Sequence, residues 1–362
     1  MAMSRSKQHP YWSMLLLACA WPLSASALAQ DARGDDPQAL AALDGSATKI
    51  RRDRAGHVVE VSFRGAQTAD EDLLPLDKLT HLRSVLLNDT DITDVGLQTL
   101  GKIHTLENLD LRGCAITNKG IRSLGDLGKL KALRLSGKSG RTRVDDAALE
   151  QIGKMQNLKA LLLDYLWISD AGVAKLADLE KLEELYLAGT LLGDAGTVTI
   201  GQLPRLKKLR LAKTQVTGEG LVALAKNKRL KDLDLSECSQ LTDASLSALS
   251  QMPQLTRLNL WRVPVGDVGI RSLEPLRELR WLNLDNTQLS DAGLKYLRRM
   301  QSLEFLHLGS TSVSDAGMVQ LAPLVALKDL KVTRTAVTEK GVAALKEKLP
   351  GTEIQLEYLG NH

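Results

Sequence analysis

A pattern of apolar residues repeats along most of this 362-residue chain with a period of about 24 residues. Residues 303–321 show it in full, as L-x-x-L-x-L-x-x-T-x-V-x-D-x-G-M-x-x-L. Its first apolar position recurs twelve times between Val58 and Leu327, at spacings of 24 except for one of 28 and one of 25. A repeat of this length indicates a chain of stacked units, each contacting only its neighbours.

Each unit has two halves that differ in periodicity. The L-x-L half alternates apolar and polar residues, which is typical of a strand with one buried face. The G-L-x-x-L half, for example around Leu97, Leu100 and Ile103, places its apolar residues on one side of a helix. Because one strand and one helix cannot bury these faces alone, the units must stack around a continuous core.

The pattern resembles the leucine-rich repeat. Its Asp-x-Gly-Leu half, and the segment Cys238 to Leu246 above all, is similar to the cysteine-containing subclass. Thr in place of that Cys, as at Thr190 or Thr311, resembles secreted bacterial members. The resemblance implies a right-handed α/β solenoid (horseshoe) of about twelve strand–helix repeats over residues 58–346. The parallel sheet would form the concave face and the helices the convex face.

A column of aspartates recurs at one position of the repeat, and its simplest explanation is helix capping rather than calcium binding. Most of them lie beside Ser or Thr where a helix should begin, and carboxylates there accept orphan N–H groups and suit the helix dipole. The Gly two residues later predicts a close approach between coils. The column comprises Asp94, Asp146, Asp170, Asp194, Asp243, Asp267, Asp291 and Asp315.

The ends of a solenoid need caps, because the terminal units have only one neighbour. Residues 49–57 predict an N-terminal cap hairpin that turns at Asp53–Gly56, and residues 30–48 a flexible leader. Residues 347–362 predict a C-terminal cap with a short polar edge strand. Thr197 stands where an apolar residue should begin a helix, so an irregular coil is expected there.

Residues 1–29 have the form of a secretory signal peptide. Arg5 and Lys7 precede a short apolar run that ends in Ala27-Leu-Ala29. We therefore expect cleavage after Ala29 and an exported protein, periplasmic or extracellular. The alternative is lipid anchoring through Cys19, because Leu16-Leu-Ala-Cys19 resembles a lipoprotein signal.

Charge and cysteine content exclude several classes of protein. A formal net charge of +4 is too small for a chain-wide phosphate-binding surface, so no nucleic acid partner is expected. Three cysteines cannot build a disulfide-rich scaffold. Cys114 and Cys238 lie five repeats apart, about 24 Å along a stack of strands, which is too far for a disulfide. We expect both to be buried and free.

No motif in the chain indicates catalysis. The histidines show no metal-ligand spacing, and no nucleophile lies beside a base in a known motif. The segment Ala132 to Ser139 satisfies a permissive P-loop pattern, but its first residues belong to a repeat strand and no helix follows. We therefore expect no enzyme, no cofactor, no metal and no nucleotide.

Aromatic residues make up only 3% of the chain, yet five fall at strand positions that should face away from the core. Exposed aromatic rings supply much of the energy of protein interfaces. One candidate group lies on three consecutive repeats. A second lies beside the four-residue insertion of the long repeat, the 28-residue unit that begins at Leu130. The first comprises Trp261, Trp281, Phe305, Asn259, Asn283, Arg262 and His307; the second comprises Tyr165 and Tyr186.

These observations favour a non-catalytic, exported recognition scaffold that binds a protein partner with its concave face, as a monomer. A glycan ligand or an envelope-scaffold role is the alternative, because Trp beside Asn and Arg also suits a sugar. The alternative without a ligand is that the rings cover one another and the backbone. Cysteine-containing repeats also occur in F-box substrate receptors, but residues 30–48 leave no room for an F-box.

Overall fold

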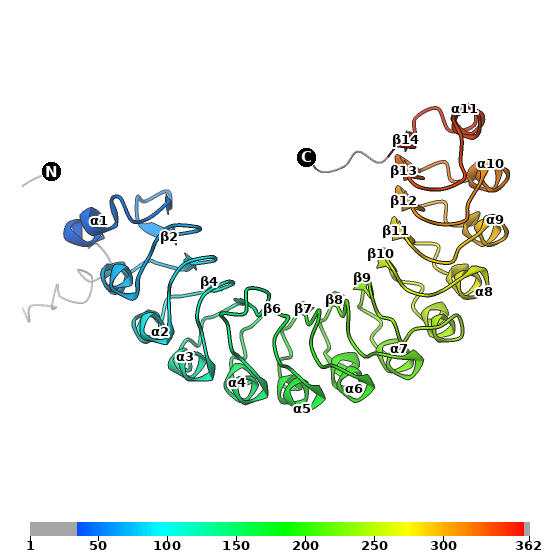
Figure 1. Cartoon of the computed structure of the whole chain (residues 1–362). Coiled ribbons are helices and arrows are strands. Elements are labelled where there is room, and N and C mark those ends of the chain that lie inside the picture. Colours follow the sequence, from blue (N-terminus) through cyan, green and yellow to red (C-terminus); the bar gives the residue numbers. More distant parts are fainter. Residues whose placement is uncertain (1–34, 358–362) are drawn as a thin grey trace, which may run out of the picture. The chain divides into compact units, whose positions relative to one another are not determined.

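The computed structural model describes residues 35–357, which form one arc of stacked strand–helix coils (Figure 1). The signal peptide and the Cys19 signal predicted from the sequence lie outside the described residues. Fourteen strands form one open sheet in sequential order, on the inside of the arc, and the helices cover the outside. All strand pairs are parallel except β1–β2. The expected solenoid is confirmed.

The strands of the repeats are short, because each coil gives the sheet only its L-x-L segment. They are β1 Lys49–Arg52, β2 Val58–Ser62, β3 Ser84–Leu86, β4 Asn108–Asp110, β5 Ala132–Ser136, β6 Ala160–Asp164, β7 Glu184–Tyr186, β8 Lys208–Arg210, β9 Asp232–Asp234, β10 Arg257–Asn259, β11 Trp281–Asn283, β12 Phe305–His307, β13 Asp329–Lys331 and β14 Glu353–Gln355.

The helices are also short. In several coils a 3₁₀ helix follows the α-helix or replaces it. The α-helices are α1 Pro37–Leu43, α2 Asp94–Leu100, α3 Asn118–Ser123, α4 Asp146–Ile152, α5 Asp170–Val173, α6 Asp194–Gln202, α7 Gly218–Leu224, α8 Asp267–Ile270, α9 Asp291–Leu294, α10 Asp315–Met318 and α11 Glu339–Lys346. The 3₁₀ helices are η1 Asp70–Lys78, η2 Ala174–Leu176, η3 Ser245–Gln251, η4 Arg271–Leu273, η5 Lys295–Leu297 and η6 Val319–Leu321.

The core is a continuous column of aliphatic side chains between the sheet and the helices. In the three-residue strands from β3 to β13 the middle residue is buried, as Leu258, Leu282 and Leu306 are, and in β10, β11 and β12 its two neighbours are partly exposed. Because adjacent strands pair in register, leucines from successive coils stack directly on one another. This stacking buries apolar surface that a single coil would expose.

The aspartate column does not cap its own helices, so the capping prediction is wrong in this respect. Asp94 is the first residue of α2, and the cap is Thr93, whose hydroxyl accepts from the backbone N–H of Val95. The Asp94 carboxylate instead reaches the next coil. It accepts the backbone N–H of Thr117 at 2.8 Å and the Thr117 hydroxyl at 2.5 Å. The column therefore joins neighbouring coils.

The same contact recurs along the arc, and we call it the aspartate ladder. Each carboxylate accepts the N–H of the residue 23 positions later, at 2.7–2.9 Å. Glycine 26 positions later makes room for it, since a Cβ there would lie 2.1–2.7 Å from the carboxylate Oδ1. The Asp–Gly pairs are Asp70–Gly96, Asp94–Gly120, Asp146–Gly172, Asp170–Gly196, Asp194–Gly220, Asp243–Gly269, Asp267–Gly293, Asp291–Gly317 and Asp315–Gly341.

Cys114 and Cys238 are buried and free, as expected. Each Sγ lies 3.1 Å from a backbone carbonyl of the preceding coil, on Leu87 and Leu211 respectively. Burial raises the pKa of both thiols, that of Cys114 to about 11. The two cysteines therefore occupy the repeat's inter-coil position as neutral, structural side chains.

The expectation of a flexible leader over residues 30–48 is wrong for residues 35–48. Residues 37–43 form α1, whose N-terminus is capped by Asp36. Leu43 is fully buried and packs in the core that η1 also contacts. The Asp35 carboxylate accepts the N–H of Val58 at 2.6 Å. This segment closes the N-terminal end of the core, which β1 and β2 alone would leave open.

The expectation of an irregular coil at Thr197 is wrong, whereas the expected C-terminal edge strand is present. The coil around Thr197 is regular: Thr197 is buried and its hydroxyl donates to the Asp194 carbonyl at 2.6 Å, so α6 forms normally. The coil that departs is the next but one, where η3 replaces an α-helix. At the C-terminus, β14 pairs with β13 as the last strand of the sheet.

Candidate functional site

Each repeat strand presents two outward side chains on the concave face, and the parallel register aligns them into rows across the sheet. Arg257, Trp281 and Phe305 are direct partners in one row, on β10, β11 and β12. Asn259 and Asn283 are partners in the next row, which continues with His307, and Lys331 follows it there on β13. Five of the residues selected from the sequence therefore belong to this surface: Trp281, Phe305, Asn259, Asn283 and His307.

The centre of this surface is a column of stacked rings and cations. The Trp281 and Phe305 rings lie 4.9 Å apart between centroids and are almost parallel, at 4°. The Arg257 guanidinium carbon lies 3.4 Å from the Trp281 centroid, and Lys331 Nζ lies 5.7 Å from that of Phe305. We call these four residues the aromatic column. Stacking and cation–π contacts of this kind are each worth about 0.5–1.5 kcal/mol.

The column is partly covered but not buried. Trp281 and Phe305 are half-buried because they lie against each other and against their cationic neighbours. His307 meets Phe305 edge to face, with ring centroids 6.4 Å apart at 72°. Burial lowers the pKa of His307 from its ordinary value, with the nearby Lys331 adding to that effect. The imidazole is therefore a largely neutral part of the surface at pH 7.

The two asparagines beside the column have local structural partners. Asn259 Oδ1 accepts the backbone N–H of Trp261 at 3.2 Å, and Asn283 Oδ1 accepts that of Asp285 at 2.9 Å. Each side chain thus holds the turn that follows its own strand. Their amide nitrogens are the groups that can contribute to recognition.

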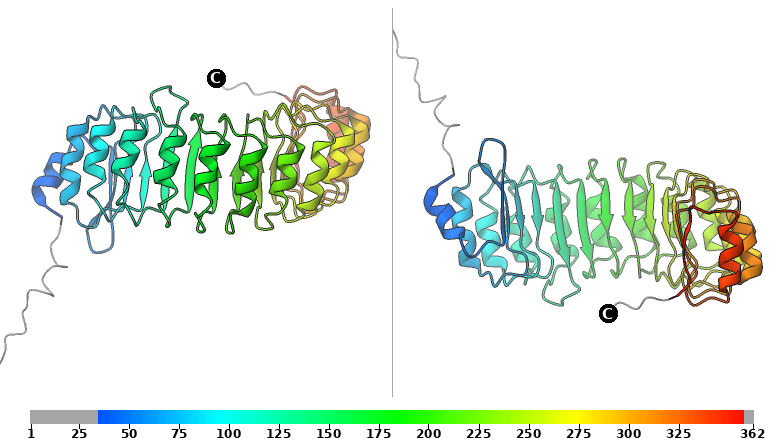
Figure 2. Two further views of the ribbon diagram at one scale, coloured as in Figure 1. Left: turned by 90° about the horizontal axis from the view of Figure 1, so that it is seen from below. Right: turned by 90° about the horizontal axis from the view of Figure 1, so that it is seen from above.

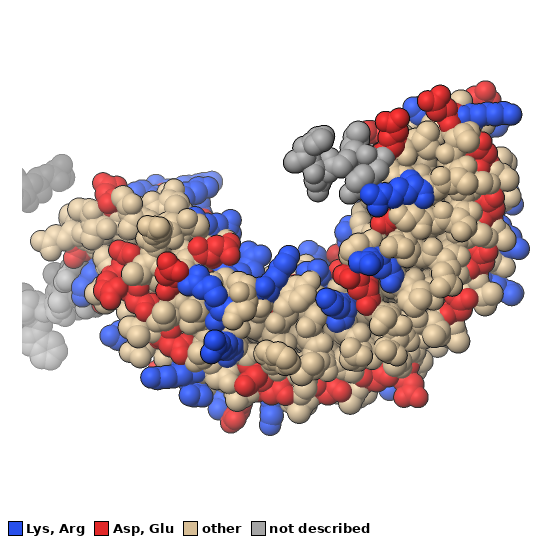
Figure 3. Space-filling model, in the orientation of Figure 1, with Lys and Arg blue, Asp and Glu red and all other residues tan. Residues whose placement is uncertain are grey.

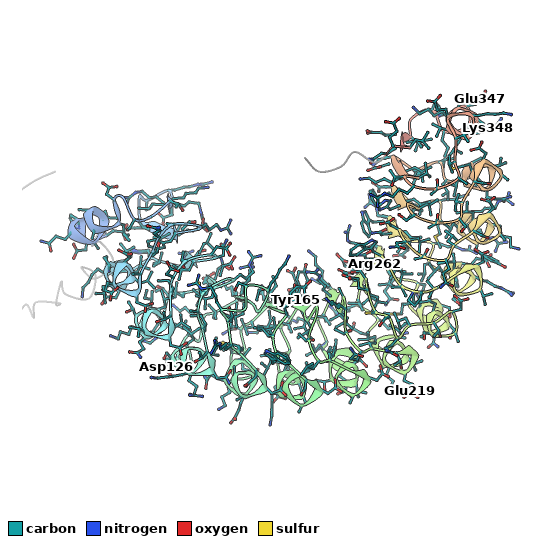
Figure 4. The ribbon with its side chains drawn as sticks, in the orientation of Figure 1. Asp126, Tyr165, Glu219, Arg262, Glu347 and Lys348 are labelled. Carbon is teal, nitrogen blue, oxygen red and sulfur yellow. The ribbon has the colours of Figure 1, made fainter. Side chains whose placement is uncertain are left out.

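Trp261 is not part of the aromatic column, although the sequence grouped it there. It lies two residues beyond Asn259, after the end of β10. Its ring packs with Arg262, whose guanidinium carbon is 5.3 Å from the centroid. Arg262 also lies 3.6 Å from the Glu237 carboxylate and has a left-handed backbone, with φ of 56°. These residues form a separate group, and Arg262, which Figure 4 labels, lies on the inner side of the arc.

The tyrosine group is also divided. Tyr186 lies on β7 in the concave sheet, and burial together with Glu184 raises its pKa. Tyr165 instead follows β6 in a left-handed conformation, with φ of 61°, and its ring lies over Gly189. A Cβ on Gly189 would approach that ring to 2.5 Å. Trp167, at the edge of this group, is 70% exposed.

A charged hollow in the middle of the concave face was not predicted from the sequence, although two of its lining residues, Tyr186 and Asn259, were selected individually. It measures about 250 Å³ and is lined by side chains of β7 to β10, including Tyr186, Asp232 and Arg257. Arg210 bridges two carboxylates, Asp164 at 2.8 Å and Asp234 at 3.2 Å. The sequence signal for this hollow was the opposite charge of two neighbouring strands. The outward residues of β8 are basic and those of β9 are acidic.

Two carboxylates, Asp232 in the lining and Asp164 beside it, have a raised pKa. Burial raises the pKa of both, although Arg210 and Arg257 respectively oppose the shift. Among residues 35–357, no cluster of three or more His, Cys, Asp or Glu side chains is arranged to hold a metal ion.

Within the same described range, no helix is long and apolar enough to cross a membrane.

Known structures resemble this fold at low sequence identity. An internalin (inlF) of Listeria monocytogenes aligns with a TM-score of 0.64 and 21% identity, over 91% of this chain and 96% of that one. A leucine-rich repeat protein of Leptospira interrogans aligns with a TM-score of 0.50 and 18% identity, over 78% and 80% of the two chains. At these identities the likeness concerns the fold alone.

Comparison of the sequence itself is more decisive for the family. No curated protein matches the sequence significantly. The family model described as a leucine-rich repeat region matches residues 57–292, which is more than half of the chain. The match covers the strands β2 to β11 and the aspartate ladder between them. The protein therefore belongs to the leucine-rich repeat family.

Proposed function

We propose that this protein is a non-catalytic recognition scaffold that binds a protein partner on its concave face. The observation that supports the proposal is the aromatic column on β10 to β13. Trp and Arg are the residues that most often dominate binding energy at protein interfaces, where they sit at the centre of the buried surface. Here they are half-exposed on an open sheet, with a charged hollow beside them.

The column is also preorganised. Arg257 and Phe305 come from the strands on either side of Trp281 and pack against its ring, so its orientation is set before a partner arrives. Side chains that are already ordered lose less conformational entropy on binding. The column can therefore contribute its contacts at a smaller entropic cost than mobile surface residues would.

The same geometry favours a protein over a glycan. A sugar recognised by tryptophan stacks on the open face of the ring, but the neighbours of Trp281 lie against its faces. The ring edges and the cations remain for contact. Those edges suit apolar side chains and backbone carbonyls of a partner protein better than a sugar ring.

We further propose that the chain is exported, on the strength of the signal-peptide pattern in residues 1–29. The two solved structures of similar fold, the internalin and the Leptospira protein, both come from bacteria. Mass spectrometry of the mature protein from fractionated cells tests the proposal. Cleavage after Ala29 leaves Gln30 as the first residue, whereas lipidation would leave an acylated Cys19. An uncleaved N-terminus in the cytosolic fraction would contradict export.

Binding is tested by affinity capture from cell-envelope and extracellular extracts. The mature protein is compared with a Trp281→Ala/Phe305→Ala variant and with a Tyr296→Ala control. The control removes a ring that also contacts a cation, Lys295, but lies on the helical side. A partner that the wild type and the control retain and the column variant loses, with affinity then measured on purified components, supports the proposal. Equal retention by all three proteins would place binding elsewhere.

A further inference from the structure

The N-terminal half of the concave face carries a concentration of positive charge that the aromatic column does not explain. We call it the basic cluster: Arg64 after β2, Arg112 after β4, Arg134 on β5, and Lys138 in the insertion of the long repeat. Figure 3 shows Lys and Arg side chains gathered on the inner face along this part of the arc. The insertion itself stands out as a loop from the edge of the sheet (Figure 2).

The cations of the cluster outnumber the carboxylates that contact them. Asp110 is 1% exposed and accepts two hydrogen bonds from Arg112, at 2.9 Å and 2.6 Å. Arg64 shares the same carboxylate at 3.9 Å, with about half of its own side chain exposed. Arg134 donates to a neutral group, the side-chain oxygen of Asn108. One buried carboxylate is thus shared by two guanidinium groups, which leaves the surface positive.

This charge borders a hollow. The hollow measures about 350 Å³, and Arg112, Lys138, the hydroxyls of Ser136 and Ser139, and Asp89 line it together with Asn88 and Gly113. Two cations and two hydroxyl donors face a single carboxylate there. An anionic group entering the hollow would meet hydrogen-bond donors from two neighbouring coils, Arg112 on one and Ser136, Lys138 and Ser139 on the next.

We propose that the basic cluster and its hollow bind an acidic peptide segment of the partner protein. The cations of the cluster belong to the coils of β2, β4 and β5, which span about 14 Å across the sheet. An extended peptide with several Glu or Asp carboxylates can contact more than one of these cations at once. A single inorganic phosphate ion can occupy the hollow beside Arg112 and Lys138 but cannot span the row. The proposal rests on the proposed function, because it describes a second contact of the same concave face.

The test uses a defined probe on the purified mature protein. Fluorescein-labelled octaglutamate is titrated and followed by fluorescence anisotropy, with octalysine as the probe of opposite charge. The site variant is Arg64→Gln/Lys138→Gln, which leaves the Arg112–Asp110 pair intact and so preserves the buried carboxylate's partner. The matched control is Arg277→Gln/Arg298→Gln, which removes the same two charges from exposed positions on the helical side.

The wild type and the control should bind octaglutamate, and the site variant should bind about fivefold or more weakly, because two partly exposed ion pairs are lost. Binding should weaken as salt increases. A wild type that does not bind the peptide overturns the proposal, as does an equal loss in the site variant and the control. A heparin-derived octasaccharide that binds through the cluster when octaglutamate does not would identify a sulfated-glycan site and also overturn it.

Failure of this proposal is distinguishable from failure of the proposed function. Trp281 lies seven strands from β4, about 34 Å along the sheet. Trp281→Ala should therefore bind octaglutamate as the wild type does, whatever its effect on the partner. An Arg112→Gln variant, checked for folding by circular dichroism, should lose peptide binding as the site variant does.

Discussion

At the scale of single residues, the aspartate ladder explains why Asp and Gly occur together in this chain. The carboxylate of one coil occupies the space that a Cβ of the next coil would need. Two coils carry another residue at the ladder position, and the glycine position of the next coil is then also changed. Gly218 faces Ser245, and Asn118 corresponds to Ala148 in the next coil. The two positions are therefore coupled through space, between neighbouring coils.

The ladder predicts a measurable coupling. Gly120→Ala should destabilise the protein by about 2 kcal/mol, because its Cβ would overlap Asp94 Oδ1 in a packed site. Asp94→Ala should cost about 1–3 kcal/mol, since it leaves the Thr117 N–H without its acceptor. The double variant should lose less than the sum, because removing the carboxylate makes room for the methyl group. Urea unfolding of the four proteins measures this, and strict additivity would contradict it.

His307 predicts a pH dependence at a single residue. Because burial lowers its pKa in the folded protein, the unfolded chain binds the proton more readily between that pKa and 6.5. The free energy of unfolding should therefore rise with pH through this window and keep its full value above it. NMR titration should place the His307 pKa below 6.5, and His307→Gln should flatten the pH profile. A pKa at or above 6.5 would refute this.

At the scale of elements, the sequence predicts what repeats and misses what occurs once. The 24-residue period identifies the twelve repeat strands because each must bury its middle leucine. By contrast, α1 has seven residues, no second copy and only two buried side chains, Ala39 and Leu43. The sequence signal for it is local and short: Asp36 is an N-cap, Pro37 occupies the first turn, and the Ala and Leu residues that follow favour a helix.

The α1 helix makes a prediction of its own. Leu43→Ala should lower the free energy of unfolding by about 2–4 kcal/mol, because the side chain is fully buried. Leu40→Ala, on the same helix but only partly buried, should cost clearly less. Thermal unfolding and the hydrogen exchange of the first repeats report the effect. Equal, small effects of both substitutions would show that α1 does not seal the core.

The candidate site was predictable where it lies on strands. Trp281 and Phe305 are outward strand residues, and strict alternation places them on the concave face. Trp261 and Tyr165 lie beyond the strand ends, where the backbone turns, so alternation no longer fixes their direction. The charged hollow and the basic cluster were missed because their partners, such as Arg210 and Asp164, are 46 residues apart and meet only across coils.

At the scale of the whole described arc, the concave face is divided into zones of different chemistry. The basic cluster occupies β2 to β5, the charged hollow β7 to β10 and the aromatic column β10 to β13. Coupling between distant coils passes only through their neighbours. The zones at the two ends should thus act on a partner independently, one through charge and the other through apolar contact.

This independence predicts how a partner's affinity responds to mutation and salt. The free-energy losses of Trp281→Ala and Arg64→Gln/Lys138→Gln should add within about 0.5 kcal/mol, because the sites are far apart. The affinity of Trp281→Ala should fall with salt as steeply as that of the wild type. The site variant should show a shallower slope, because screening acts on the charges it has lost. Titration calorimetry at several salt concentrations measures both quantities. An equal reduction of slope in both variants would mean that the two zones bind as one site.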